Sequence, residues 1–228
     1  MRDFRNLKKI SDYEMLDIPE SVICPHPAIP VENEFYILRM LVRPKYGDFR
    51  IPESLGFLSD TIRLLSQYDR ERTGIYDSWC YVTIRHGEVS SKTDDDFHFD
   101  GASFRTDIIP ERNYVWVNHT GTEYKTGELK FPSDFNPLLH NIFTFVENRL
   151  KDKPIERMDA KQWYMLSPFC LHRRPKITNG VKRTFYRICF SDIEGRDINN
   201  TNNPLIPTPF YGRNPVDSFR NKLLDYDQ

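Results

Sequence analysis

The sequence of 228 residues has few cysteines and no long hydrophobic run. No CxxC pair occurs and three of the four cysteines lie in apolar stretches, so we expect free, mostly buried thiols at Cys24, Cys80, Cys170 and Cys189. No apolar stretch approaches the roughly 18 residues that a transmembrane helix needs. The N-terminal segment MRDFRNLKKI also lacks the apolar run of a secretory signal. These absences favour a cytoplasmic protein without a membrane partner.

The sequence also has little net charge and lacks repeated segments. The formal net charge of -1 gives no overall attraction to nucleic acid, so any nucleic-acid partner would have to be met by a local basic patch. We find no internal repeat and no low-complexity segment. By contrast, the hydrophobic fraction of 39%, the aromatic fraction of 14% and the 16 prolines are typical of a packed globular protein with many loops. We expect a single domain over residues 1–228.

Two segments have the period of amphipathic helices. Leucine and isoleucine recur at three- and four-residue spacings in residues 53–69, and residues 134–152 follow the same period. Four other segments alternate aromatic or β-branched residues with polar ones and are bounded by Gly, Pro or Asn, which predicts strands. The expected strands are residues 78–89, 113–124, 161–172 and 182–192.

The fold class predicted from these segments is α+β and mainly β. A strand-rich core is expected over about residues 75–192, with helical support from residues 1–74 and a loop with a short helix in residues 193–228. Within that last part, residues 197–215 are rich in Asn and Pro and predict a long loop. A loop after the last strand of such a core is a common place for a lid, but the sequence alone does not assign that role.

The stretch DDDFHFDGASF, residues 94–104, contains a candidate pair of metal ligands. Side chains two positions apart on an extended chain point to the same side, so His98 and Asp100 can aim at one point. The alternative is that the three preceding acids form a solvated hairpin tip and that these two residues continue it.

A third ligand is expected at His172, which ends an apolar segment and can be held rigidly there. Two histidines and one carboxylate on one face leave adjacent coordination positions open, the arrangement of non-haem Fe(II) oxygenases. Eleven residues beyond His172, the segment KRTFYRICF places Arg183 and Arg187 on one face of a strand. Arginines on an inward face are costly unless an anion meets them, and a dicarboxylate would do so.

These residues, in this order and spacing, resemble the Fe(II)/2-oxoglutarate-dependent oxygenase superfamily. Its signature is His-x-Asp, a distal His and then an Arg or Lys, which HFD at 98–100, His172 and Arg183 match. The resemblance covers roughly residues 75–192 and is closest in character to prolyl-hydroxylase-like and phytanoyl-type members. The spacing of Arg183 and Arg187 is similar to that of the taurine-dioxygenase-like group.

The resemblance implies a double-stranded β-helix, also called a jelly roll or cupin-like barrel, with supporting helices. It implies an oxidoreductase, a dioxygenase that uses Fe(II), 2-oxoglutarate and O2, releases succinate and CO2, and hydroxylates its substrate. His98, Asp100 and His172 would hold the metal, and Arg183 would pair with the distal carboxylate of 2-oxoglutarate. Tyr114 and Asn118 are further candidates for cosubstrate contacts, with a core aromatic and a turn former as the alternatives.

The substrate is expected to be a small molecule, an amino acid or a nucleotide-like compound. Arg187 is the first candidate for an anchor of an anionic substrate and Arg105 the second. Arg173, Arg174 and Lys176 either give the site mouth a positive potential or, as the favoured alternative, form a solvated loop. The acids before His98 would instead favour a cationic substrate, so both charges remain open.

A function of a different class is a cupin-like module that binds a metal or ligand without redox turnover. Arg183 distinguishes the two readings, because such a module has no need of an arginine at that distance from the distal histidine.

Overall fold

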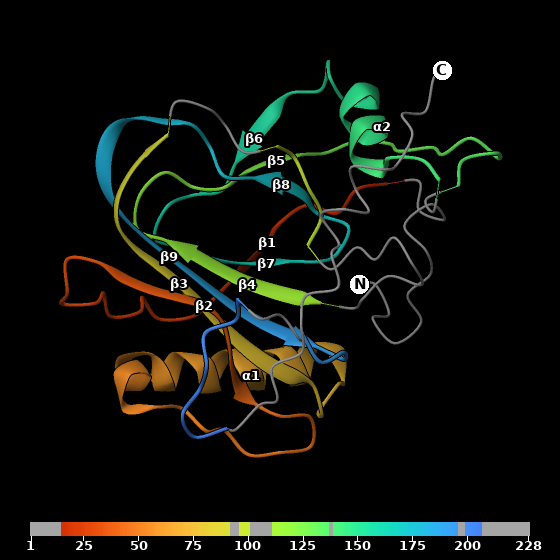
Figure 1. Ribbon diagram of the computed structural model, residues 1–228. Coiled ribbons are helices and arrows are strands. Elements are labelled where there is room, and N and C mark those ends of the chain that lie inside the picture. The colour runs from red at the N-terminus through yellow and green to blue at the C-terminus, as the bar shows by residue number, and fades with distance from the viewer. Residues whose placement is uncertain (1–14, 92–95, 101–110, 137–138, 196–198, 207–228) are drawn as a thin grey trace.

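Two antiparallel sheets stacked in layers form the body of the protein. The computed structural model describes these parts of the chain: residues 15–91, 96–100, 111–136, 139–195 and 199–206. Within them, helix α1 (Ser59–Thr73) covers the outer side of the larger sheet, and the smaller sheet lies on the other side with helix α2 (Ile142–Arg149) beside it (Figure 1). The prediction of an α+β protein that is mainly β is confirmed.

The larger sheet has six strands in the spatial order β1, β7, β4, β9, β3, β2, and the smaller has three in the order β6, β5, β8. In chain order, the strands are β1 (Glu20–Val22), β2 (Phe35–Arg43), β3 (Trp79–Ser91), β4 (Arg112–Val117), β5 (Glu123–Lys125), β6 (Ile155–Arg157), β7 (Trp163–Leu166), β8 (Leu171–Arg173) and β9 (Ile177–Ser191). The two longest, β3 and β9, pair along most of their length and curve at one end towards the smaller sheet (Figure 1).

Alternation along β9 divides its side chains between the two faces, as predicted for residues 182–192. Tyr186, Ile188 and Phe190 are fully buried in the core that α1 covers. Arg183 and Arg187 therefore point the other way, into the space between the sheets.

Helix α1 is amphipathic because its apolar residues recur at helical spacing, and the predicted helix over 53–69 is confirmed with a short 3-10 segment at its start (Glu53–Leu58). Leu58, Ile62 and Leu65 are fully buried against the larger sheet. Full burial of such side chains stabilises the fold by about 1.5–3 kcal/mol each. The helix ends at Gly74, whose φ of 67° is the left-handed conformation that glycine adopts without strain.

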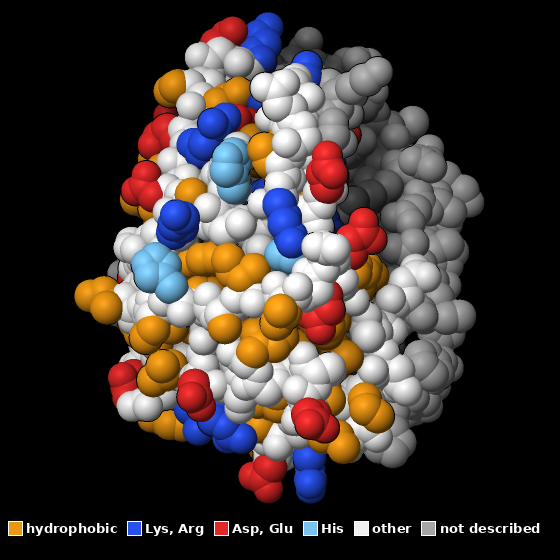
Figure 2. All heavy atoms as spheres, turned by 90° about the vertical axis from the view of Figure 1, so that its left-hand side faces the viewer, with side chains coloured by type: hydrophobic (Ala, Val, Ile, Leu, Met, Phe, Trp, Pro, Cys, Tyr) orange, Lys and Arg blue, Asp and Glu red, His pale blue; other side chains and the backbone are white. Residues whose placement is uncertain are grey.

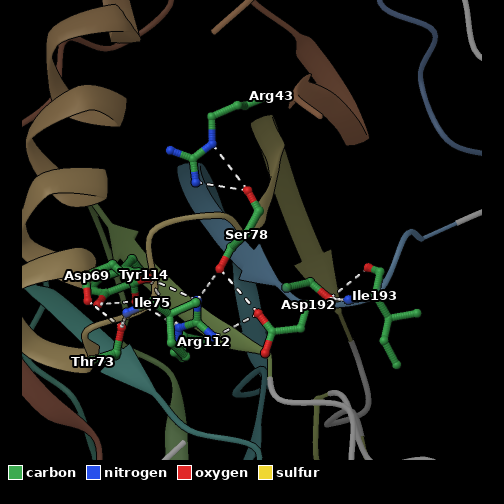
Figure 3. Close-up of polar contacts among 10 residues, drawn as sticks. Arg43, Asp69, Thr73, Ile75, Ser78, Arg112, Tyr114, Asp192 and Ile193 are labelled. Carbon is green, nitrogen blue, oxygen red and sulfur yellow. Dashed lines mark hydrogen bonds and ion pairs between the residues drawn. The ribbon is translucent and has the colours of Figure 1, made fainter. Parts of the chain in front are cut away.

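A buried polar network fastens α1 to the sheet (Figure 3). The Arg112 guanidinium on β4 donates to the Asp69 carboxylate at 2.9 Å, and the Tyr114 hydroxyl donates to the same carboxylate at 2.9 Å. Arg112 also donates to the Ser78 hydroxyl at 2.6 Å, and Arg43 donates to the Ser78 carbonyl. The charged groups of this network all have hydrogen-bond partners. Burial of a charged group costs much less free energy under this condition.

The second helix is shorter than the predicted span of residues 134–152 and begins only at Ile142. Asn141 has an extended backbone, and its side-chain oxygen accepts hydrogen bonds from the N–H groups of Phe143 and Thr144. A proline disfavours helical geometry in the residue before it, and Asn136 in this segment precedes a proline. The cap therefore starts the helix later than its hydrophobic period indicates.

Two predicted strands are each divided between the sheets. Residues 113–124 form β4 and β5, which are separated by a loop, and residues 161–172 form β7 and β8. In the first loop, the Cβ of any residue other than glycine at Gly121 would lie 1.7 Å from the Met158 carbonyl oxygen. In the second, the Cys170 N–H donates to the Ser167 carbonyl in a turn beside a proline. The chain thus passes from one sheet to the other at both points.

The parts outside the expected core differ from prediction. Residues 1–74 were expected to be helical support, but they also supply β1 and β2 at the two edges of the larger sheet. Part of the predicted loop over residues 197–215 is described, and there the Asn203 side chain donates to the carbonyls of Leu41 and Arg50. The predicted closing helix after this loop lies outside the described residues.

The four cysteines are free thiols as predicted, and all except Cys24 are buried. In the described ranges, no helix is both long and apolar enough to cross a membrane. The surface exposes some large hydrophobic side chains, among them Ile23 and Val31 between β1 and β2. On the face seen in Figure 2, hydrophobic atoms gather in a band, with basic and histidine side chains above it.

Candidate metal centre

His98 and His172 are brought together by the backbone. They form an isolated antiparallel bridge in which the N–H of each residue donates to the carbonyl of the other, at 2.9 and 3.0 Å. The two imidazole centroids lie 4.6 Å apart. His172 reaches this position because it lies on β8, after the turn that carries the chain into the smaller sheet.

Each imidazole is oriented by a carbonyl two residues upstream in the chain. The Nδ1 atom of His98 lies 2.9 Å from the Asp96 carbonyl oxygen, and that of His172 lies 2.9 Å from the Cys170 carbonyl oxygen. A carbonyl can only accept, so Nδ1 carries the proton in both rings and a neutral ring keeps its lone pair on Nε2. Such anchoring of one ring nitrogen is usual for histidines that bind a metal through the other.

Asp100 completes a cluster in which one possible ligand atom from each residue lies within 4.8 Å of the others. Its Oδ2 atom is 3.4 Å from Nε2 of His172 and accepts a hydrogen bond from Arg187 at 2.9 Å. The same three residues were predicted as metal ligands from the sequence, and the structure places them together.

The electrostatic environment favours an ionised Asp100 and a neutral His98, which are the forms that bind a cation. Burial alone would raise the pKa of Asp100, but the Arg187 guanidinium and the neighbouring imidazoles outweigh it and hold that pKa well below its usual range. Burial, with His172 close by, lowers the pKa of His98 despite the opposing effect of Asp100. An ionised carboxylate and a neutral imidazole are the forms that coordinate metals.

The cluster opens onto a cavity of about 190 Å³ between the two sheets. Its walls come from β3, β4, β7 and β9 of the larger sheet and from residues around β5 and β8. The residues that line it are Thr83, Arg85, His98, Asp100, Val115, Thr122, Leu166, His172, Arg174, Arg183, Phe185 and Arg187.

The two arginines predicted on β9 both line this cavity. Arg183 is buried, with 5% of its surface exposed, and its guanidinium lies 5.5 Å from the Phe185 ring centroid. Arg187 was expected to anchor a substrate, yet here its guanidinium is engaged by Asp100.

Tyr114 and Asn118, predicted as cosubstrate contacts, do not line the cavity. Tyr114 points to the opposite face of β4, where its hydroxyl donates to Asp69 in the network beside α1 (Figure 3). The Asn118 side chain continues the sheet: it accepts from the Thr184 N–H at 2.7 Å and donates to the Lys182 carbonyl. The structure therefore supports the core and turn alternatives for these two residues.

The remaining substrate predictions have mixed outcomes. Arg105 lies outside the described residues. Of the three residues expected in a solvated loop, Lys176 is exposed, but Arg173 pairs with Glu123 at 2.9 Å and Arg174 lines the cavity.

Sequence reasoning missed Arg85 and the hydroxyl residues Thr83 and Thr122 as parts of the cavity wall. Arg85 lies on β3, directly opposite Phe185 of β9 in the register. A signal for it was present, because alternation places Thr83 and Arg85 on the same face of one strand. The sequence alone, however, does not determine which face of β3 points into the cavity, because this depends on the pairing of β3 with β9.

Comparison with known proteins finds similar solved structures. No protein-family model and no curated protein matches the sequence. The solved structure of AviO1 from Streptomyces viridochromogenes Tue57 is similar, with 13% sequence identity over 79% of this chain and 78% of that chain and a TM-score of 0.44. Function is therefore inferred from the geometry of the site.

Proposed function

We propose that this protein is an Fe(II)- and 2-oxoglutarate-dependent dioxygenase that hydroxylates a small molecule and releases succinate and CO2. The observation that supports this most is the convergence of His98, Asp100 and His172 on one cavity with the Arg183 guanidinium in its wall. We further propose that the two facing sheets are a double-stranded β-helix, in which metal ligands and cosubstrate arginine come from opposite sheets.

The donor set fits a ferrous ion. Two neutral imidazoles and one carboxylate are the ligands of the facial triad used by non-haem Fe(II) enzymes, which leaves positions for cosubstrate and O2. When bound, the ion activates O2 for decarboxylation of 2-oxoglutarate and for oxidation of a substrate C–H bond. The carbonyls that hold Nδ1 of each histidine keep both rings aimed at the ion.

Arg183 has the position and chemistry to bind the distal carboxylate of 2-oxoglutarate. Its planar guanidinium can donate two parallel hydrogen bonds to a carboxylate, and burial strengthens such a contact because water competes less. Phe185 beneath the guanidinium restricts its orientation. The apolar residues Val115 on β4 and Leu166 on β7 exclude water from the neighbouring part of the cavity wall.

The proposal is tested by mixing the protein with Fe(II) and 2-oxoglutarate without oxygen. A visible metal-to-ligand charge-transfer band is expected, and admission of air should yield succinate. In His172→Ala the band should be absent because the ion loses a ligand. Absence of the band in the wild-type protein would contradict the proposal, whereas a band without succinate formation would favour a non-redox metal-binding module.

Arg183→Gln tests the cosubstrate role separately. Loss of a charged hydrogen-bonding partner costs about 1.5–3 kcal/mol, so we expect 2-oxoglutarate affinity to fall roughly ten- to a hundredfold while metal binding persists. Lys182→Gln is the matched control, since the neighbouring Lys182 is exposed on the same strand. Equal 2-oxoglutarate affinity in both variants would assign the role to another cation.

A further inference from the structure

We propose that the substrate of this site is a small anion, a carboxylate or a phosphate ester, and that Arg85 binds its charged group. The inference rests on the proposed function, because it assigns the substrate of that same cavity. Arg85 takes the role that the sequence indicated for Arg187.

The charge of the cavity wall is the first argument. Four of the lining residues are arginines, Arg85, Arg174, Arg183 and Arg187, whereas the lining contains one carboxylate, that of Asp100. Guanidinium groups remain protonated in proteins, so they cannot relieve their mutual repulsion by losing a proton. A bound ferrous ion would add two further positive charges. A cationic substrate is therefore disfavoured here, and an anionic one is attracted.

The second argument is that two of these arginines have other roles. Arg187 is held by Asp100 at 2.9 Å, and Arg183 is the residue assigned to the distal carboxylate of the cosubstrate. Arg85 differs from both, because among the described residues its side chain has no hydrogen bond or ion pair. It is also exposed, so it reaches the cavity where solvent and an incoming ligand can enter.

The register places Arg85 between the other two cationic positions. On β9, Arg183 and Arg187 flank Phe185, and Phe185 is the residue paired with Arg85 on β3. Diagonal neighbours on one face of a sheet stand about 7–8 Å apart, which is within reach of a long side chain, so Arg85 starts near both Arg183 and Arg187. On the far side of β9 the same sheet face is apolar, with Val115 on β4 and Leu166 on β7. The site thus fits a molecule with an anionic group and an apolar carbon portion.

The test uses the protein loaded with Fe(II) and saturating 2-oxoglutarate in the absence of oxygen. Acetate and methyl phosphate are titrated at constant ionic strength, with neutral acetamide as the comparison, and binding is followed by calorimetry and by perturbation of the charge-transfer band. We expect saturable binding of at least one anion and none of acetamide. The two anions distinguish a carboxylate from a phosphate substrate.

Arg85→Gln should weaken anion binding at least tenfold, and Arg85→Lys should weaken it less, because the charge remains. Arg63→Gln is the control: Arg63 is an exposed arginine on α1, outside the cavity. All three variants should keep the charge-transfer band, which shows that metal and cosubstrate still bind.

The outcomes separate this inference from the proposed function. If the wild-type protein lacks the band, the proposed function fails. If the band forms but the anions bind Arg85→Gln as tightly as wild type, bind neither protein, or abolish the band by displacing 2-oxoglutarate, the assignment of Arg85 is wrong.

Discussion

Each candidate metal ligand among the histidines is oriented by its own local backbone. His98 and His172 both donate from Nδ1 to a carbonyl two residues earlier, so the direction of Nε2 is fixed before any ion arrives. Preorganisation of this kind lowers the entropy cost of binding a metal. Asp100 is fixed differently, by a guanidinium from the facing sheet.

The protonation of His98 should reflect its burial. Because burial lowers its pKa, we expect the ring to titrate below the ordinary histidine value of about 6.5 in the metal-free protein. The unfolded chain then takes up this proton first, so falling pH costs stability from about pH 6.5 downwards. Proton NMR titration, with His98→Gln to assign the resonance, measures this. A His98 pKa above 6.5 would contradict the inferred environment.

Arg187→Gln should raise the pKa of Asp100, because the nearest positive charge is removed. A carboxylate whose pKa is lowered by folding contributes stability above its unfolded pKa and loses it as pH falls through the folded pKa. In the variant that loss should be smaller and complete at a higher pH, although it still begins near the unfolded carboxyl pKa. Carboxyl carbon NMR and acid unfolding curves measure both effects, with Arg63→Gln as the control, whose curves should match wild type.

Residue spacing predicted the three ligands and the arginines of β9, because ligand spacing and strand alternation are local properties. It left Tyr114 open between a cosubstrate contact and a core aromatic. The alternation of a strand places Tyr114 and Asn118 on the same face. Which face points into the cavity, however, depends on pairing with strands that are distant in the sequence. Tyr114 faces Asp69 of α1, a partner 45 positions away in the sequence.

At the scale of elements, the chain changes sheets where its hydrophobic pattern shows no interruption. Residues 161–172 alternate like one strand, yet a turn at Ser167 divides them into β7 and β8. The helix over 134–152 was overestimated for a similar reason, since Asn141 caps it inside a continuous period. Hydrophobic spacing predicts which residues are buried better than where an element begins or ends.

The loop between β4 and β5 should tolerate no side chain at Gly121. A Cβ there would lie 1.7 Å from the Met158 carbonyl, so in Gly121→Ala the backbone must move, and we expect a loss of about 1–3 kcal/mol of unfolding free energy or more. Gly56→Ala is the matched control, because no atom lies within 4 Å of the added Cβ. Urea denaturation of both variants measures the difference; equal stability would contradict the close approach.

At the scale of the whole molecule, α1 is held to the larger sheet by apolar packing and by the Asp69–Arg112 pair (Figure 3). The sequence predicted this helix and the strand-rich class. It did not predict that β1 and β2 complete the sheet, because short edge strands bury few side chains and leave a weak pattern.

Asp69→Ala should be strongly destabilising, by about 3–5 kcal/mol, because the fully buried Arg112 guanidinium loses its closest carboxylate and keeps the more distant Asp192, at 3.8 Å. Glu128→Ala removes one partner of the exposed pair with Lys130 and should leave stability almost unchanged. Thermal and chemical unfolding of both variants provide the measurement. A small effect of Asp69→Ala would show that water or another group replaces the carboxylate.

The candidate metal-ligand cluster lies between two layers, so its geometry depends on how those layers pack. His172 belongs to the smaller sheet, whereas Arg187, which holds Asp100, belongs to the larger one. Substitutions in the apolar cluster that includes Met158 and Val115 should therefore alter metal affinity while the fold is still intact. A measured change in Fe(II) affinity would therefore report a change in the distance between the two sheets.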